Sequence, residues 1–491
     1  MNPQVLQQLR PYQRKPTAEL LEIVKRHRVG FDLSVTGSGK TYVAAAIAAE
    51  MQLPTLVIAP VVAESAWHRA AEHFGDKFSV VGWEMLRTGG TQFGQWENGP
   101  PPPRGERIFF KCSNCQCKID PEKIPFCGAH WAGIHCFETK VTPHKYGKFI
   151  FNPAVKLIIF DEIHRAAGDS LNGDMVIGAK RAGALTLGLT ATLAHSPLHL
   201  RATGYLAGLH NLANFDTFCG ARGCRRVPMR GIQWLAPKEK QDQIMRDIGA
   251  QIIPSKGILL TEADIPDFPA RHILPELYDL PAEDTAELNS LYELLSTPLA
   301  DLEARAAGDV DPELGLTKRL RARQRIELLK TGVATELGND YLAKGHSVVW
   351  FVNYQQTIDA LLKAFPDAGV INGAITGAKR ERVVAAFQSN ANRRLIVNNR
   401  AGGIALSLHD LQGDVPRVGL VFPDDSVVTM EQLFGRLARA GGKSAAVYRV
   451  IFASKSVEVA MRRNLELKYG NSQALKNSEN SSCNPFAKLA D

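Results

Sequence analysis

The chain has 491 residues, of which 45% are hydrophobic and 22% are charged. This composition excludes wholesale disorder and suits two or three globular domains. Lys and Arg outnumber Asp and Glu by 58 to 50, and the resulting charge of +8 is too small to identify a nucleic-acid partner by itself. No apolar run reaches about 18 residues, which excludes a membrane-spanning helix. The first residues lack the apolar stretch of a secretory signal, so we expect a cytoplasmic protein that does not contact a membrane.

Apolar stretches alternate with helical stretches in the first half of the chain. A helix is expected at 40–51, and strands are expected at 29–35, 55–59, 78–82, 155–160 and 184–189. Such alternation predicts an α/β fold with a parallel sheet and helices on both of its faces. The run GPPPPRG, which begins at Gly99, fits neither a helix nor a central strand. It opens a cysteine-rich segment that extends to about Gly147.

A second α/β series follows a charged stretch at 282–330, which is expected to be helical. Its strands are expected at 347–352, 394–397, 418–422 and 446–452, with a helix at 379–387. The sequence therefore predicts one α/β domain at 1–86 and 148–270, an insertion at 87–147, and a second α/β domain at 271–470 that includes a helical linker. The polar residues 471–491 are expected to form a flexible tail.

A glycine-rich segment follows the first strand and precedes the first long helix. It consists of Thr36, Gly37, Ser38, Gly39, Lys40 and Thr41. Glycines let the backbone N–H groups of such a loop face phosphate at the positive end of the helix. Lys40 is then expected to contact the β- and γ-phosphates of ATP, and Thr41 to hold magnesium. Ser34 replaces the first glycine of the full phosphate-loop pattern, and a plain glycine turn is the alternative interpretation.

An acidic pair, Asp161 and Glu162, directly follows the buried strand at 155–160. Acidic side chains at the carboxyl end of a central parallel strand point toward the crevice where nucleotides bind. We expect Asp161 to bind magnesium through water and Glu162 to polarise the attacking water. The alternative, a helix N-cap, is disfavoured by the phosphate loop on a neighbouring strand.

Read together, these motifs resemble those of the superfamily-two helicases and translocases, with a second motif of the DExH type. The resemblance implies two RecA-like domains that bind ATP between them. Gln13, in the segment RPYQ, resembles the family's adenine-reading residue. Thr190 and Thr192 resemble the third motif, which couples hydrolysis to nucleic-acid contact, although Leu193 stands where that motif usually continues with Pro.

The segment QLFGRLAR resembles the sixth motif of the same family. The resemblance makes Arg439 the arginine finger and places Gln432 and Arg436 beside the γ-phosphate. A guanidinium from the opposite domain is suited to this task because the leaving phosphoryl group gathers negative charge. In the region of the fifth motif, Ala405 and Ser407 stand where Gly and Asn are usual, which puts the coupling to nucleic acid in question.

The resemblance covers roughly residues 8–86 and 148–455 and is strongest to the Swi/Snf-type branch. The segment LTEADIPDFPARHILP, which ends at Pro275, is similar to the part of that branch that joins the two lobes. The chain has no room for large remodelling insertions, so the resemblance implies a compact phage or bacterial form, located in the cytoplasm of the bacterium or of the infected host.

Five of the eight cysteines fall between Cys112 and Cys136. A cluster inside a cytosolic chain favours metal over disulfides. Thiolate and imidazole ligands at these spacings fit one tetrahedral zinc, and the preferred ligands are Cys112, Cys115, Cys127 and Cys136, with His130 as the substitute. An iron–sulfur cluster and ordinary reduced thiols remain alternatives. The metal either stabilises the fold of the insertion or helps the insertion to contact DNA, and the sequence does not distinguish these roles.

Two further stretches are basic, and they are either DNA-facing or solvated. The first contains Arg222, Arg225, Arg226 and Arg230, and the second is KRLRARQR at 318–325. The sequence as a whole predicts an ATP- and magnesium-dependent DNA translocase or helicase, with replication, recombination or repair proteins as possible partners. An RNA helicase and an ATP-gated clamp that binds DNA without stepping are the alternatives.

Overall fold

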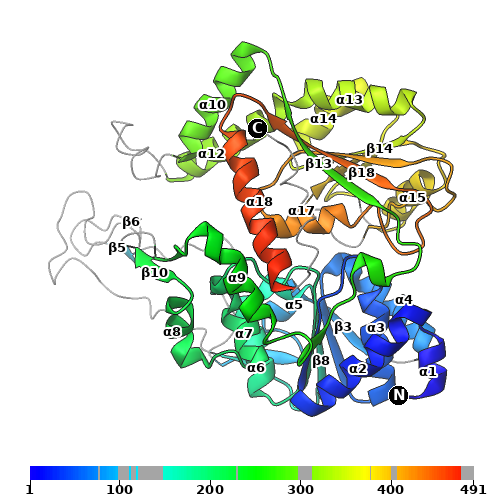
Figure 1. Ribbon diagram of the computed structural model, residues 1–491, viewed down its shortest axis with the longest axis vertical. Helices are drawn as coiled ribbons and strands as arrows, with labels where there is room; N and C mark the ends of the chain where they lie inside the picture. The colour runs from blue at the N-terminus through cyan, green and yellow to red at the C-terminus, as the bar shows by residue number, and fades with distance from the viewer. Residues whose placement is uncertain are drawn as a thin grey trace.

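The computed structural model describes residues 1–75, 78–97, 110–111, 118–119, 148–227, 231–296, 312–375, 377–399 and 406–476. Parallel strands form two six-stranded sheets, one in each half of the chain, and helices flank both sheets (Figure 1). The predicted α/β class is confirmed, and the two halves are consistent with two RecA-like domains. We call them the N-lobe and the C-lobe.

The N-lobe sheet has the order β12-β1-β9-β8-β2-β3. Its strands are β12 (Gly257–Ile258), β1 (Val29–Asp32), β9 (Leu185–Leu189), β8 (Leu157–Asp161), β2 (Thr55–Ala59) and β3 (Ser79–Gly82). Five of these six strands were expected, with ends that differ by no more than three residues, and β12 was not expected. Because both faces of the sheet are covered, β1 and β2 are buried at every position, which explains why such strands appear in the sequence as uninterrupted apolar runs.

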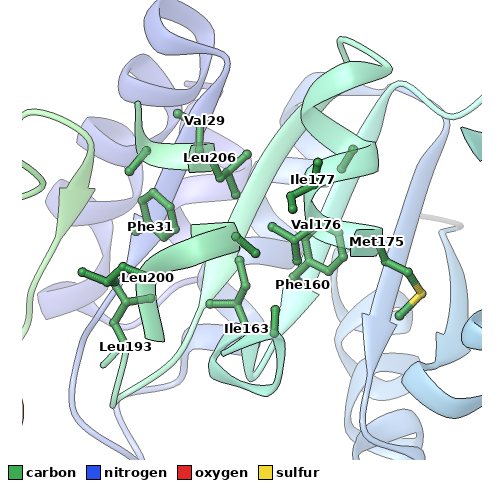
Figure 2. Packing of buried hydrophobic residues seen from close by; sticks show 14 of the residues in the cluster. Val29, Phe31, Phe160, Ile163, Met175, Val176, Ile177, Leu193, Leu200 and Leu206 are labelled. Carbon is green, nitrogen blue, oxygen red and sulfur yellow. The ribbon is translucent and has the colours of Figure 1, made fainter. Parts of the chain in front are cut away.

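Helices cover the two faces of the N-lobe sheet with different sets of apolar side chains. On one face lie α2 (Pro11–His27), α3 (Lys40–Met51) and α4 (Glu64–Phe74). On the other face lie α6 (Leu171–Arg181), α7 (Arg201–Ala207) and α9 (Lys238–Gly249). Figure 2 shows this second core, where Phe31 and Phe160 from the sheet meet Val176 and Leu206 from the helices.

The C-lobe sheet has the order β13-β18-β17-β14-β16-β15. Its strands are β13 (Arg271–Tyr278), β18 (Ala446–Ala453), β17 (Arg417–Val421), β14 (Ser347–Val352), β16 (Arg394–Asn398) and β15 (Gly369–Ile371). Its helices are α10 (Ala282–Ser296), α12 (Pro312–Leu328), α13 (Thr331–Ala343), α14 (Gln355–Ala364), α15 (Gly377–Gln388), α17 (Val427–Phe434) and α18 (Glu458–Leu475). The strand β13 begins in the segment that the sequence assigned to the join between the lobes and extends three residues beyond it.

Smaller elements complete the described part of the N-lobe. The helices are α1 (Pro3–Gln7), α5 (Trp83–Arg87) and α8 (Phe215–Gly220), and the short strands pair as β4 (Gly94–Trp96) with β7 (Phe149–Phe151), β10 (Cys224–Val227) with β11 (Gly231–Trp234), and β5 (Phe110–Lys111) with β6 (Lys118–Ile119). Trp96 is 3% exposed within the N-lobe core. Phe93 and Trp96, near the start of the expected insertion, thus pack with the N-lobe core.

The predicted flexible tail from residue 471 is wrong for its first residues. Helix α18 continues to Leu475, although this stretch is polar. The reason is tertiary packing, since Asn471 donates a hydrogen bond to Gln241 of α9 (3.0 Å) and Leu475 joins the N-lobe core. Figure 1 shows α18 running from the C-lobe to α9 in the N-lobe. Among the described residues, no helix is both long and apolar enough to cross a membrane.

Candidate active site

The glycine-rich loop connects β1 to α3 and requires glycine at two positions. Gly37 (φ +83°) and Gly39 (φ +88°) adopt left-handed backbone conformations that other residues rarely take. Neither position has room for a side chain, because a Cβ on Gly37 would lie 2.8 Å from Cγ of Arg439, and one on Gly39 would lie 2.3 Å from Nε2 of Gln13. The loop therefore curls ahead of the N-terminus of α3, which is the arrangement that binds phosphate.

Lys40, the first residue of α3, turns its side chain back into this loop. Its Nζ donates hydrogen bonds to the carbonyl oxygens of Ser34 (2.8 Å) and Val35 (3.0 Å). Burial lowers the pKa of Lys40, while the nearby carboxylates of Asp32 and Glu162 oppose that shift. The ammonium group is thus held by backbone oxygens at the place where a phosphate would bind.

Gln13 lies against the outer side of the loop. Its Nε2 donates to the carbonyl oxygen of Ser38 (2.8 Å), and its Oε1 accepts from the backbone N–H of Arg10 (3.1 Å). The hydroxyl of Tyr12 donates to the same carbonyl of Ser38 (3.2 Å). The structure therefore brings Gln13 to the phosphate loop, whereas its role in reading adenine stays a prediction.

Asp161 ends β8, and two tryptophan indoles hold it in place. The Nε1 of Trp67 donates to Oδ2 of Asp161 (2.9 Å), and the Nε1 of Trp83 donates to its backbone oxygen (2.9 Å). Burial, together with the charge of Glu162, raises the pKa of Asp161 to about 6. A bound cation would stabilise the ionised form of such a carboxylate, because its charge offsets the cost of ionising the group away from water.

Glu162 follows with a left-handed backbone conformation (φ +54°). Burial would raise its pKa, but the hydrogen bond from His164 and the charges of Lys40 and Arg436 outweigh burial and lower the pKa to about 2. Nδ1 of His164 lies 3.3 Å from Oε2 of Glu162. The neighbouring carboxylates thus have pKa values displaced in opposite directions, which is the pattern of groups with separate chemical tasks.

Two arginines reach the same place from the C-lobe, after the end of α17. Burial lowers the pKa of Arg436 to about 9 and that of Arg439 to about 10. Arg439 donates from Nη1 to the hydroxyl of Ser407 (2.8 Å) and from Nε to the carbonyl of Gly435 (2.9 Å). Ser407 is one of the unusual fifth-motif residues, and the structure shows that it orients the predicted arginine finger.

A cavity of about 290 Å³ lies between the lobes at this point. It is lined by Thr36, Gly37, Gly39, Lys40, Thr41, Asp161, Glu162, Arg436 and Arg439, together with Tyr42, Ala63, Ala66, Arg69 and Ser407. The first nine were predicted from the sequence, and the structure brings them together. Arg69 of α4 was missed, because nothing in its local pattern distinguishes it from a solvated charge on a helix.

The remaining predicted residues lie just behind the cavity. Nδ1 of His164 lies 2.9 Å from the hydroxyl of Thr190, which in turn accepts from the backbone N–H of Thr192 (3.0 Å). Nε2 of Gln432 lies 3.4 Å from Nε2 of His164. The third and sixth motifs therefore meet through His164, directly behind Glu162.

The predicted zinc ligands Cys112, Cys115, Cys127 and Cys136, and the substitute His130, lie outside the described residues, so their arrangement stays a prediction. Within the described ranges, no group of three or more His, Cys, Asp or Glu side chains is placed to hold a metal ion.

The arginines of the two predicted basic stretches differ in their exposure and in their contacts. Arg222 stacks over the ring of Phe218, with 3.8 Å from its Cζ to the ring centroid, so it is engaged in packing. Arg225 and Arg226 are exposed on β10. Arg325 of the second stretch is paired with Glu287. Arg230 lies outside the described residues.

Two α/β lobes with a phosphate loop and an acidic pair on one side of a cavity and two arginines on the other define a nucleotide hydrolase of the helicase type. Residues 332–441 match the helicase conserved C-terminal domain. A protein of Acanthamoeba polyphaga mimivirus, named "Putative ATP-dependent RNA helicase L364", is 26% identical over 487 residues, which cover 96% of this chain and 84% of that protein. These findings support placement in the helicase superfamily, and the chain is an enzyme of the ATPase and helicase class.

Proposed function

We propose that the protein is an ATP-dependent DNA translocase or helicase of the DExH type, most similar to the Swi/Snf-type branch. One observation carries the ATP-driven part of this proposal. Lys40 and the acidic pair of the N-lobe face Arg436 and Arg439 of the C-lobe across one cavity. A site completed by both lobes couples hydrolysis to their relative movement, because each nucleotide state favours a different contact between them.

The cavity residues fit ATP with magnesium. The hydroxyl of Thr41 and the carboxylate of Asp161 are oxygen ligands of the kind that magnesium prefers, and both line the cavity. When bound, magnesium neutralises charge on the β- and γ-phosphate oxygens. Lys40 binds those phosphates together with the backbone N–H groups of the loop.

Glu162 is the residue that acts on the attacking water. Its carboxylate lines the cavity beside Lys40 and Asp161, where it would orient and polarise the attacking water. Arg436 and Arg439 stabilise the charge that gathers on the transferred phosphoryl group. Arg436 is buried and Arg439 is partly buried, so the surrounding protein screens that interaction less than water would.

The test is ATP hydrolysis measured with duplex DNA, single-stranded DNA and RNA, on the wild-type chain and on Glu162→Gln. We expect stimulation by DNA in the wild type and a loss of at least about 10² in kcat in the variant. Native-rate hydrolysis by Glu162→Gln would refute the assigned chemistry. A triplex-displacement assay separates stepping from an ATP-gated clamp, because a clamp hydrolyses ATP without displacing the third strand.

An RNA helicase is the second candidate, and a specific observation favours it. The mimivirus relative carries the words RNA helicase in its name. The assay with three nucleic acids decides between the candidates, since stronger stimulation by RNA than by either form of DNA would replace our proposal with this one.

We also propose zinc in the cysteine-rich segment, because cysteine pairs spaced as in Cys112 and Cys115 are typical of zinc ligands. Metal analysis of the purified protein tests this directly. About one zinc per chain supports the assignment, and iron with sulfide would replace it by a cluster.

A further inference from the structure

Glu431 is a buried carboxylate inside the lobe interface that none of the predicted motifs includes. It lies on α17, one residue before Gln432, and is 5% exposed. A buried carboxylate is costly unless it is paired and hydrogen-bonded, so its partners show what it serves.

Both carboxylate oxygens of Glu431 are occupied. Oε2 accepts a hydrogen bond from the hydroxyl of Thr192 in the N-lobe. Oε1 lies 2.7 Å from Nζ of Lys476 and accepts from Nε2 of Gln473 (3.2 Å), and the hydroxyl of Ser472 lies 3.4 Å from Oε2. Burial alone would raise the pKa of Glu431, but the Lys476 ammonium and these hydrogen bonds lower it. The group is therefore ionised and held by two elements outside its own helix.

One of these elements, α18, joins the hydrophobic cores of both lobes. Its residues Leu465 and Tyr469 pack in the C-lobe core, whereas Ala474 and Leu475 pack in the N-lobe core. The fit at its end is tight, because a Cβ on Gly249 of α9 would lie 1.8 Å from the carbonyl oxygen of Leu475. Lys476 directly follows this anchored end, so its backbone is held at the N-lobe while its ammonium pairs with Glu431 of the C-lobe.

The other element is the third motif, and it leads back to the catalytic glutamate. Thr192 donates its backbone N–H to the hydroxyl of Thr190, which lies 2.9 Å from Nδ1 of His164. The opposite ring nitrogen of His164 lies 3.4 Å from Nε2 of Gln432, the neighbour of Glu431 in sequence. The contacts thus form a closed ring across the two lobes, from Glu431 through the third motif and His164 to Gln432 and back to Glu431. Glu431 is the residue of this ring that belongs to none of the predicted motifs.

We propose that Glu431 is a positioning residue for ATP hydrolysis. By holding Thr192 and Lys476 at once, it sets α17 against the N-lobe and thereby places Arg436 and Arg439 at the cavity and Gln432 against His164 behind it. The inference rests on the proposed ATPase site and adds a residue to it. It makes the end of α18 part of the catalytic machinery, although α18 does not line the cavity.

The test compares double variants in which no charge is left buried and unpaired. Glu431→Leu with Lys476→Met removes the ion pair and the acceptor for Thr192, whereas Glu431→Gln with Lys476→Met keeps an acceptor oxygen. We expect the first to lower the nucleic-acid-stimulated kcat at least about tenfold, with the KM for ATP within about twofold of the wild type. We expect the variant with Glu431→Gln and Lys476→Met to have a kcat at least about fivefold higher than the variant with Glu431→Leu and Lys476→Met.

The control removes another buried ion pair, which lies within the C-lobe. In this pair, Nζ of Lys330 is 2.7 Å from Oε1 of Glu458. Glu458→Leu with Lys330→Met changes a pair of the same chemistry away from the cavity, so it should affect the melting temperature but not kcat. A loss of kcat that follows the melting temperature equally in all the variants would overturn the proposal. So would equal kcat in the Leu and Gln variants of Glu431.

If the double variant with Glu431→Leu does not fold, substitutions of Thr192 test the same contact. Thr192→Val keeps the shape of the side chain and removes the hydroxyl, whereas Thr192→Ser keeps the hydroxyl. The proposal requires a larger loss of kcat for Val than for Ser, and equal losses would overturn it. Wild-type protein without ATPase activity would refute the proposed function itself, an outcome that is distinct from equal variants of an active enzyme.

Discussion

Gln432 of the C-lobe lies 3.4 Å from His164 of the N-lobe, measured between their Nε2 atoms. His164 in turn contacts Glu162 through its other ring nitrogen, at 3.3 Å. Glu162, the residue proposed to act on water, is therefore connected, through one imidazole, to α17, the helix that directly precedes the arginines. Closure of the lobes and orientation of the carboxylate are thus linked by contact.

Replacing Gln432 by Ala removes this contact and leaves the phosphate loop intact. We expect kcat for ATP to fall about tenfold with little change in nucleotide affinity, because the interaction forms only when the lobes are together. Steady-state kinetics and titration with a fluorescent ATP analogue measure the two quantities. Gln251→Ala is the matched control, since Gln251 is an exposed N-lobe residue whose side-chain amide donates to the backbone oxygen of Asp247. A drop in affinity as large as the drop in kcat would contradict this account.

Arg439 should contribute to the transition state more than to binding. Its guanidinium donates hydrogen bonds to Ser407 and Gly435, which orient it. We expect Arg439→Ala to reduce kcat roughly 10³-fold and Ser407→Ala to reduce it less, because the second change only loosens the side chain. Arg382→Ala, an exposed arginine of α15, provides the control. Equal and small effects at all three positions would show that Arg439 is not the arginine finger.

Gly249→Ala tests how tightly α18 is held. The added Cβ would meet the carbonyl of Leu475 at 1.8 Å, so the two helices must separate. We expect the free energy of unfolding, measured in urea, to fall by about 1 to 3 kcal/mol. Gly332→Ala in α13 is the control, because a Cβ added there would meet nothing within 4 Å and the change should be neutral or slightly stabilising. Equal stability of the two variants would contradict tight packing of α18 on α9.

The sequence was sufficient for those parts of the site that depend on local pattern. Strands buried on both faces, such as β2 and β8, appear as short apolar runs, and the glycines of the phosphate loop mark a backbone that only glycine adopts easily. Asp161 and Glu162 were found because they directly follow such a strand. The arginines after α17 came from resemblance to a family and could not have been derived from spacing.

Residues that act through distant contacts could not be predicted. Glu431 looks like an ordinary helix carboxylate, and only folding places it between Thr192 and Lys476, which are 239 and 45 positions away in the chain. The polar composition from residue 471 predicted a flexible tail, but apolar contacts of Ala474 and Leu475 with the other lobe overrode local preference.

The pair His195 and His199 predicts an acid-sensitive fold. Their rings lie edge to face, with centroids 4.2 Å apart, and Nδ1 of His195 has no hydrogen-bond partner among the described residues. Burial, assisted by His199 and by the charge of Lys468, lowers the pKa of His195 to about 3. A histidine with a lowered pKa is neutral in the folded chain while the unfolded chain takes up a proton. Stability is therefore lost as the pH falls below the ordinary histidine value of about 6.5.

His195→Asn should reduce this loss. We expect the wild type to lose about 1 to 2 kcal/mol more than the variant in free energy of unfolding between pH 7.5 and pH 5. Lys468→Met should also weaken the pH dependence, but by less, because burial is the larger cause of the shift. Urea unfolding at the two pH values gives the four free energies needed for each comparison. If wild type and His195→Asn lose the same stability on acidification, the uncharged, buried state of His195 is wrong.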